Sequence, residues 1–456
     1  MSRSWLVLAA LSILLGTLLG APSADFRASD PGVRDDLPGA GGHLEGLTPR
    51  QIGFFEVGKE DFEEAEDVGD GLGPRFNFTG CGGCHSQPAI GGTSPAFNPL
   101  VEVPRTFTGN VVPPFITGDG PIREARFKYR PDGTRDGGVH NLFVISGGEG
   151  ADGCDIKQED FEAQLAQNNV IFRIPSPTFG AGLIEQIPDS AILANMSANA
   201  SAKRSLGIRG RPHWISGHPN NNGNDGTIAR FGWKAQNKSL LLFSGEAYNV
   251  EMGITSELFQ TERDETPSCQ FAQVPNDVTE TEGEQTTERG TARISAIENF
   301  GFFQRFLAPP TPSNAVRGAS SSSIARGRTL FATVGCAYCH TPTLRTGNST
   351  VEALRDKDVH LFSDLLLHNM GPGLADDILQ GSAGPDEFRT SPLWGLGQRI
   401  FFLHDGRTTD LLEAIHAHRS GGNSRHHASE ANGVINRFNN LRESEKQNIL
   451  DFLRSL

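Results

Sequence analysis

Cys81-Gly-Gly-Cys84-His85 and Cys336-Ala-Tyr-Cys339-His340 share the pattern C-x-x-C-H, and these two stretches decide how the chain is organised. C-x-x-C followed directly by His is the attachment site of c-type haem. The two thiols add across the vinyl groups of one porphyrin, and the adjacent His then reaches the iron as proximal ligand. A redox C-x-x-C would leave the repeated His unexplained, and a zinc site would need further ligands at compact spacing. The sequence therefore predicts two covalently bound haem c groups, with His85 and His340 on the irons.

The N-terminus has the features of an export signal. Arg3 precedes an apolar run from Trp5 to Leu19, and small residues follow at 21–24. Such a run is short for a bilayer span and typical of the apolar region of a signal peptide. We expect residues 1–24 to be a signal peptide, with an uncleaved anchor as the alternative. The mature protein should then be soluble and periplasmic.

Two of the six cysteines lie outside the haem motifs, in polar loops rich in Gly or Ser. These are Cys154 and Cys269. In an oxidising compartment two remaining cysteines most simply form a disulfide. The alternative is a pair of free thiols.

The composition is that of a globular protein with acidic character. Of 456 residues, 37% are hydrophobic and 21% are charged, enough apolar material for two cores. The 54 Gly and 27 Pro residues indicate many turns and long loops. The formal net charge of −14 argues against nucleic acid or an anionic membrane as partner. It would suit a basic electron-donor protein, or serve solubility alone.

The two motifs divide the chain into two haem units. The first unit is expected at 47–307, with a small β and loop insertion, and the second at 324–456. A stretch rich in Pro and Ser, residues 308–323, has the composition of a linker. We expect residues 25–46 to be a loose leader and the acidic stretch 262–289 to be an exposed loop. The fold class is mainly α, and Ile449, Leu453 and Leu456 predict a core-facing stripe on the last helix.

The two units resemble a diverged repeat. Trp233 and His404 each stand in an aromatic turn seven residues before a Leu-Leu pair. An Ala follows each pair, after Glu246 and Glu413, and four residues beyond it stand Glu251 and His418.

The second haem has several candidates for a distal ligand. His418 shares a helical face with Leu411 and Ile415, at i, i+4 and i+7, whereas His416 points away from that face. We therefore favour His418, with Met370 next, although a structural role for this His is the alternative. The candidates considered are Met370, His368, His404, His416 and His418.

In the first unit the repeat places a carboxylate where His418 stands in the second. Glu251 is a poor iron ligand, but a carboxylate above an open iron can take and return a peroxide proton. Glu185 is the rival acid, and a surface position for Glu251 is the alternative. Trp233 could shorten electron transfer between the haems, or be a core Trp. His140, His213 or His218 could close the first haem at rest.

Seven further stretches carry a resemblance to a known family, and together they span about residues 50–456. They are Leu72–Phe78, Phe179–Pro188, Gly232–Ala235, Met252–Ser256, Phe362–Gly371, Arg389–Leu396 and Phe402–Arg407. The chain resembles the bacterial di-haem oxidoreductases, relatives of di-haem cytochrome c peroxidase and of the methylamine-utilisation di-haem enzyme. Each stretch alone is weak, and the set is specific.

The resemblance implies two cytochrome-c-like helical domains, with the haems facing a shared interface. It implies a Trp between the haems, matched by Trp233, and a distal Glu, matched by Glu251 within Asn249–Met252. Relatives carry a distal Met or Tyr where His418 stands, so this chain departs toward a bis-His second haem of lower potential. Relatives often bind calcium between the domains, but no clear calcium loop is present here.

These observations favour an enzyme. The first hypothesis is a periplasmic di-haem oxidoreductase that reduces hydrogen peroxide. Its electrons would come from a small cytochrome or cupredoxin and pass from the second haem through Trp233 to the first. The alternatives are a non-catalytic di-haem electron carrier and a di-haem oxidase or oxygenase with an unknown substrate.

Overall fold

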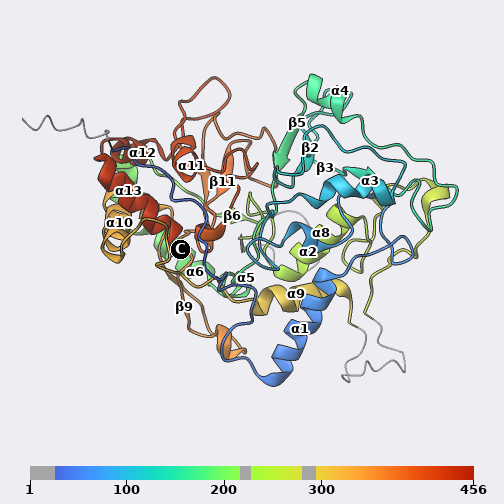
Figure 1. Ribbon diagram of the computed structural model, residues 1–456, viewed down its shortest axis with the longest axis horizontal. Coiled ribbons are helices and arrows are strands. Elements are labelled where there is room, and N and C mark those ends of the chain that lie inside the picture. The colour runs from blue at the N-terminus through green and yellow to red at the C-terminus, as the bar shows by residue number, and fades with distance from the viewer. Residues whose placement is uncertain (1–25, 216–226, 280–293) are drawn as a thin grey trace, which may run out of the picture.

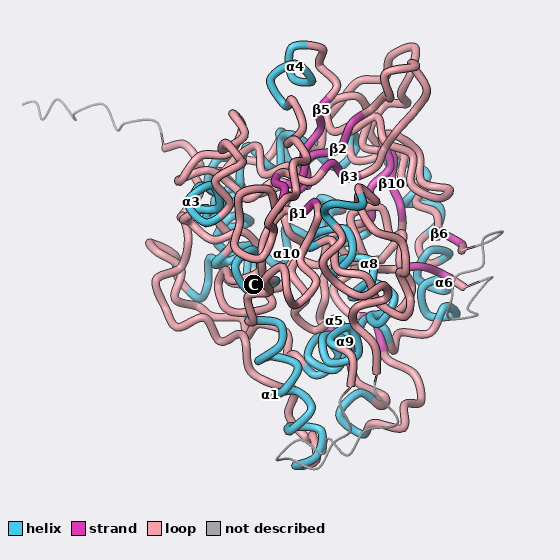
Figure 2. The backbone as a smooth tube through the Cα atoms, turned by 90° about the vertical axis from the view of Figure 1, so that its right-hand side faces the viewer, coloured by secondary structure: helices cyan, strands magenta, loops and turns pink. Residues whose placement is uncertain are grey.

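The computed structural model describes residues 26–215, 227–279 and 294–456 (Figure 1). The predicted signal peptide, residues 1–24, and His218 lie outside the described residues. Helices are the main regular structure, the sheets are small, and loops make up most of the backbone (Figure 2). This agrees with the predicted mainly α class. None of the described helices is both long and apolar enough to cross a membrane.

The helices form two groups that lie side by side along the long axis, as Figure 1 shows. The first group contains α1 (Pro49–Glu63), α2 (Cys81–Cys84), α3 (Val103–Thr106), α4 (Phe161–Ala166), α5 (Ala181–Glu185), α8 (Leu240–Met252) and α9 (Ala296–Phe306). The second contains α10 (Ser321–Val334), α11 (Leu411–Ala417), α12 (Asn432–Asn439) and α13 (Glu443–Arg454), with α6 (Asp189–Ser197) and α7 (Ala200–Leu206) beside it.

Short antiparallel strands complete the fold. One sheet has three strands in the order β3-β2-β5, and the other sheets have two strands each. The strands are β1 (Arg75–Phe76), β2 (Glu124–Phe127), β3 (Val139–His140), β4 (Phe143–Val144), β5 (Val170–Arg173), β6 (His213–Trp214), β7 (Ile228–Ala229), β8 (Leu344–Arg345), β9 (Asp358–Val359), β10 (Leu367–Asn369) and β11 (Glu387–Arg389). The three-stranded sheet belongs to the insertion expected in the first unit.

Each group is built on one close helix crossing. Helix α1 packs on α9, and α10 packs on α13. A Cβ atom on Gly58 of α1 would lie 2.1 Å from the Asn299 carbonyl oxygen. A Cβ atom on Gly327 of α10 would lie 1.8 Å from the Asn448 carbonyl oxygen. In both crossings a Gly of one helix therefore lies against the backbone carbonyl of an Asn of the other. This shared contact supports the repeat inferred from the sequence.

We expect Gly58→Ala to destabilise the protein by about 1–3 kcal/mol, because the added methyl group meets backbone rather than a movable side chain. Gly53→Ala in the same helix is the matched control, because a Cβ atom there has no neighbour within 4 Å. Ala also favours helix over Gly. Denaturant unfolding of both variants measures the difference. Equal stabilities would show that the crossing tolerates a wider separation.

The N-terminal segment is not a loose leader, and that expectation is wrong. The Ala28 amide donates to Glu443 Oε2 at 2.9 Å, and the Arg34 amide donates to the Gly397 carbonyl at 2.9 Å. Asp30 accepts two hydrogen bonds from Arg454, whose side chain is 1% exposed. A buried guanidinium needs a partner of opposite charge. This pairing holds the segment against the second helix group before the chain enters α1.

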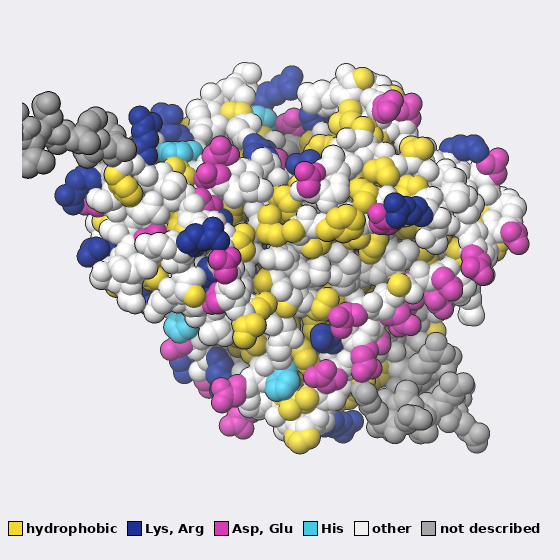
Figure 3. All heavy atoms as spheres, in the orientation of Figure 1, with side chains coloured by type: hydrophobic (Ala, Val, Ile, Leu, Met, Phe, Trp, Pro, Cys, Tyr) yellow, Lys and Arg dark blue, Asp and Glu magenta, His cyan; other side chains and the backbone are white. Residues whose placement is uncertain are grey.

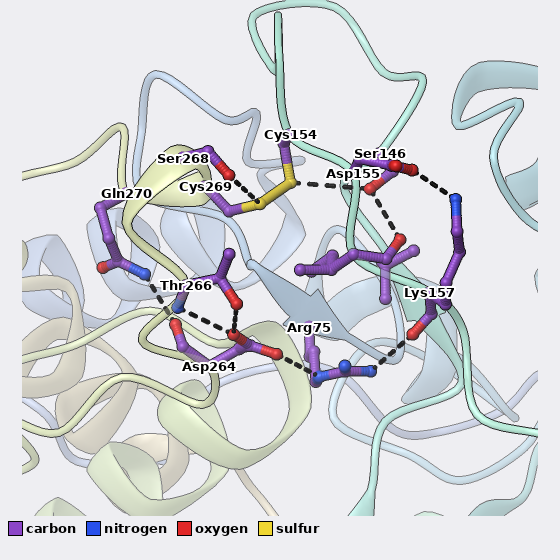
Figure 4. The surroundings of a disulfide bond; sticks show 12 residues. Arg75, Ser146, Cys154, Asp155, Lys157, Asp264, Thr266, Ser268, Cys269 and Gln270 are labelled. Carbon is purple, nitrogen blue, oxygen red and sulfur yellow. Dashed lines mark hydrogen bonds and ion pairs between the residues drawn. A yellow bond between two sulfur atoms is a disulfide. The ribbon is translucent and has the colours of Figure 1, made fainter.

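The described part of the acidic stretch 262–289 is also less exposed than expected. A disulfide joins Cys269 to Cys154, the pairing that the sequence favours (Figure 4). Cys269 is buried, and Asp264 accepts a hydrogen bond from Arg75 of β1 at 2.8 Å. The disulfide and the ion pair fasten this loop to the first group.

Apolar residues form one core in each group, and a third cluster joins α5 and the start of α8 to residues of the second unit such as Leu344 and Trp394. The predicted stripe is buried: Ile449 and Leu453 on α13, and Leu456 just beyond its end, are at most 5% exposed. On the face drawn in Figure 3, apolar side chains gather over the middle and acidic ones lie along the lower right.

Candidate functional site

Each C-x-x-C-H motif opens into its own cavity. The first cavity is lined by Cys81, Cys84 and His85 and encloses about 1140 Å³, counting space open to solvent. The second is lined by the equivalent Cys336, Cys339 and His340 and encloses about 1430 Å³ on the same count. Their other walls are mostly apolar side chains. Each cavity therefore offers two thiols and one imidazole to a large flat group.

Both motif histidines are held in the form that binds a metal. His85 Nδ1 lies 2.9 Å from the Gly92 carbonyl oxygen, and His340 Nδ1 lies 3.0 Å from that of Phe362. A carbonyl oxygen only accepts, so Nδ1 carries the proton and Nε2 keeps its lone pair. Burial lowers the pKa of His85, and burial, together with the charge of His418, lowers that of His340 to about 4.

The second cavity presents a further imidazole, that of His418 at the end of α11. Its Nδ1 lies 2.8 Å from the Ala414 carbonyl, so its Nε2 is also free. The ring centres of His340 and His418 are 6.5 Å apart. Two imidazoles on opposite sides of one metal, with bonds of about 2.0–2.1 Å, have ring centres roughly that far apart. The spacing fits a six-coordinate iron.

The other candidates for this position are placed differently. Both ring nitrogens of His368 meet carboxylates, at 3.0 Å from Asp364 and 2.8 Å from Glu430. His416 packs edge-on against Phe438 and is not among the residues that line the cavity. His368, His404 and Met370 do line it.

Two guanidinium groups also line the second cavity, that of buried Arg399 and that of half-buried Arg389. In the described part of the chain, neither Arg389 nor Arg399 is paired with a carboxylate. Burial, then the neighbouring guanidinium, lowers the pKa of Arg389 to about 10, and burial with Arg454 does the same for Arg399. Buried cations without anions are costly. The propionate groups of a haem would supply the missing negative charge, so the residues present fit this cofactor.

The first cavity has a half-buried carboxyl group, that of Glu251, and no second imidazole among the described residues. Glu251, in the last turn of α8, lines it and accepts a hydrogen bond from Asn77 Nδ2 at 2.6 Å. Asn77 Oδ1 accepts from the Leu142 amide, which fixes the amide orientation. Burial, and then the charge of Glu124, raises the pKa of Glu251 to about 8.

The rival acid lies elsewhere. Glu185 pairs with Arg305 at 2.9 Å and accepts from the Leu240 amide at the start of α8, and it does not line the first cavity.

Four charged residues that line this cavity were missed by the sequence reasoning. They are Arg123, just before β2, Glu124 and Arg126 of β2, and Arg173 of β5. Glu124 and Arg126 alternate with buried Ala125 and Phe127, so they share one face of the strand. Period-two alternation was the available signal. The sequence predicts short strands and loops for this insertion, but it does not predict which strands pair.

Trp233 lines both cavities and so lies between them. Its Nε1 donates to the Ile174 carbonyl at 2.9 Å, and its ring meets that of His404 edge-on at 6.3 Å. The repeat therefore brings its two equivalent turns into contact. Both turns are closed by a β-bridge, Phe231 with Asn237 and Phe402 with Thr408.

Other histidines do not close the first cavity within the described residues. His140 stacks on Phe127 and lies 3.0 Å from Asp136. His213 lies 2.8 Å from the Lys234 carbonyl and accepts from the Ser382 amide. Among the described residues His85 alone contributes an imidazole to this cavity, and Glu251 lines the same cavity.

No curated protein matches the chain. Among solved structures, it is similar to a MauG-like protein associated with microbial copper homeostasis, at 19% identity and a TM-score of 0.24. That match covers 35% of this chain and 56% of the other. It is also similar to hydrazine synthase of Kuenenia stuttgartiensis, at 13% identity and a TM-score of 0.36, over 98% and 99% of the chains.

One family profile matches most of the chain, over residues 125–456. Its description is "Di-haem oxidoreductase, putative peroxidase". The matched region contains the second motif, Trp233, Glu251 and His418, whereas Cys81, Cys84 and His85 precede it. The chain belongs to the di-haem oxidoreductase family.

Proposed function

We propose that the protein is a periplasmic di-haem c-type oxidoreductase that reduces hydrogen peroxide to water. The reaction consumes one peroxide, two electrons and two protons and forms two water molecules. The observation that carries the proposal is the inequality of the two cavities. The second cavity places the rings of His340 and His418 6.5 Å apart, each with Nε2 free, whereas the first has one imidazole, that of His85, and the half-buried carboxyl group of Glu251.

The residues that would hold the cofactors follow from the two cavities. Cys81 and Cys84 in the first, and Cys336 and Cys339 in the second, would form thioethers with the haems. His85 would be the single protein ligand of the first iron, and His340 with His418 the pair on the second. Arg389 and Arg399 would face the propionates of the second haem. When bound, the haems would deliver electrons to peroxide, so that its O–O bond can break.

The chain's own groups handle protons and position the redox centres. Glu251 holds a proton at its carboxyl group and can exchange it with peroxide bound in the first cavity. Trp233 fills the space between the cavities and provides a polarisable ring between the two centres. The donor would be a small cytochrome or cupredoxin that docks near the second haem, and the net charge of −14 would favour a basic one.

Optical spectra and turnover of the purified di-haem protein test this function. We expect the oxidised protein to have one high-spin and one low-spin haem, and the high-spin signal to change when peroxide is added. Peroxide should be consumed only when a reduced cytochrome or cupredoxin is supplied. Two low-spin haems that ignore peroxide would support the electron-carrier alternative instead.

We expect His418→Ala to convert the second haem from low to high spin while both haems stay attached, because Cys336, Cys339 and His340 are unchanged. His416→Ala is the matched control, since His416 is two residues away and packs on Phe438 rather than into the cavity. The oxidised spectrum is the measurement. A low-spin second haem in the His418 variant would contradict ligation by His418 and would favour Met370, which lines the same cavity.

A further inference from the structure

We infer that Glu124 is a second acid–base residue of the first cavity, and that it shares one proton with Glu251. This inference rests on the proposed peroxide reduction and extends its proton chemistry. Both carboxyl groups line the cavity, and they lie within hydrogen-bonding reach of each other. Two carboxyl groups at this range cannot both ionise cheaply, so the pair holds a single proton.

The surroundings decide which carboxyl group keeps the proton. Arg126 Nε donates to Glu124 Oε1 at 2.6 Å, and Arg173 lies directly across the sheet from Glu124. Arg173 in turn pairs with Asp376 at 2.7 Å, in a contact where both side chains are at most 3% exposed. Glu251 receives a neutral amide hydrogen bond from Asn77. The charged donors favour the anion on Glu124, and the neutral donor leaves the proton on Glu251.

The directions of the pKa shifts agree with this assignment. Burial alone would raise the pKa of Glu124, but Arg126 and Arg173 outweigh it and lower the pKa. Burial and the charge of Glu124 raise the pKa of Glu251 to about 8, and Arg126 opposes this only in part. At neutral pH Glu251 is therefore an acid, with an anionic partner beside it.

The remaining charged groups around the pair leave this arrangement intact. Glu246 of α8 is buried near Arg126 and Glu124, and burial raises its pKa. Arg263 approaches Glu251 from the disulfide-linked loop and donates to the Asn141 side chain and the Val139 carbonyl. Neither lines the first cavity. Arg123 does line it, but its Nε donates to the Asp405 carbonyl at 3.0 Å and its guanidinium lies over the Phe172 ring.

A protonated Glu251 cannot by itself accept a proton from peroxide, and Glu124 removes this obstacle. As the peroxide O–H nearer the haem breaks, its proton passes to Glu251 while the proton of Glu251 moves to Glu124. When the O–O bond breaks, one proton returns to the outer oxygen, which leaves as water. The pair then holds one proton again. The two electrons come from the donor protein, and the second oxygen takes two protons from solvent.

Infrared spectroscopy of the oxidised di-haem protein, without peroxide, tests the pair independently of activity. A protonated buried carboxyl group has its own carbonyl stretch, and that of wild type should titrate near pH 8. Glu251→Gln should abolish it. Glu124→Gln removes the neighbouring negative charge, so the midpoint should fall by roughly one unit or more. Glu162→Gln, at an exposed site on α4, is the control and should leave the midpoint unchanged.

Turnover provides the second arm. Glu124→Gln should lower peroxide reduction roughly ten-fold or more with both haems retained. Glu124→Asp keeps the charge next to Arg126 and should recover part of both the midpoint and the rate, which separates proton sharing from a folding defect. If Glu124→Gln leaves the midpoint in place or raises it, the shared proton is refuted. If wild type does not reduce peroxide, the proposed function fails while the infrared result still decides the pair.

Discussion

Glu251→Gln should lower peroxide turnover by roughly 100- to 10,000-fold, with both haems still bound. The Glu251 carboxyl group lines the same cavity as His85 and can give a proton to peroxide, and an amide cannot do so at neutral pH. The replacement is otherwise mild. Gln has nearly the same shape, and its carbonyl oxygen can accept the Asn77 hydrogen bond that Glu251 accepts at 2.6 Å.

The pH dependence of stability separates lost chemistry from lost folding. Because the folded protein raises the pKa of Glu251 to about 8, folding binds this proton more tightly than the unfolded chain does. That contribution is fully present below the ordinary Glu pKa of about 4.3 and is lost as the pH rises through about 8. Gln does not titrate. Relative to wild type, the Glu251→Gln variant should therefore gain stability as the pH is raised from 5 to 9.

Stopped-flow peroxide consumption with a reduced donor cytochrome measures the loss, and the haem spectrum confirms that both cofactors are present. Glu185→Gln is a useful comparison, since Glu185 is half-buried in the same group but lies outside the cavity. Turnover within a few-fold of wild type in the Glu251 variant would remove this residue from the mechanism, and Glu124 would then be the acid to examine.

The position of a residue could be predicted from the sequence where covalent chemistry or helical spacing fixes it. A C-x-x-C-H motif has one geometry, so its cysteines and histidines face a cavity whatever the rest of the fold does. His418 was placed by the 3.6-residue period of a short helix, and the structure puts it 6.5 Å, centre to centre, from His340. Trp233 followed from the repeat, because equivalent turns of two similar units meet at their interface.

The reasoning failed where a residue's place depends on long-range pairing. Glu124 reaches the cavity because β2 pairs with β5, whose residues lie almost 50 positions further along the chain. Local composition does not encode that register. Asp30 was read as part of a loose leader because its partner, Arg454, is at the other end of the sequence. Local composition alone does not show whether a polar, Gly-rich stretch is ordered, because a residue in it, here Asp30, can pair with a buried charge far away in the sequence.

Replacing both Cys154 and Cys269 with Ser should lower the free energy of unfolding by roughly 4 to 5 kcal/mol. The bond joins residues 115 positions apart, and closing so long a loop removes much of the entropy of the unfolded chain. The loss should appear in urea unfolding of the oxidised protein. Wild type unfolded with a thiol reductant should approach the variant, whereas the variant should not respond to reductant.

The same disulfide is connected to the first cavity. The loop that it holds contacts α8, which contains Glu251, and the segment that contains Asn77. In Figure 4 the disulfide and the Arg75–Asp264 pair hold this loop at two points. Arg75 begins the segment that leads to Asn77, the hydrogen-bond donor to Glu251. Asn249 Nδ2 donates to the Thr261 carbonyl, one turn before the end of α8. Without the disulfide, Arg75–Asp264 and this bond still hold the loop in the native state. The double variant should therefore lose stability far more than activity, and a large fall in turnover at full haem content would contradict this division.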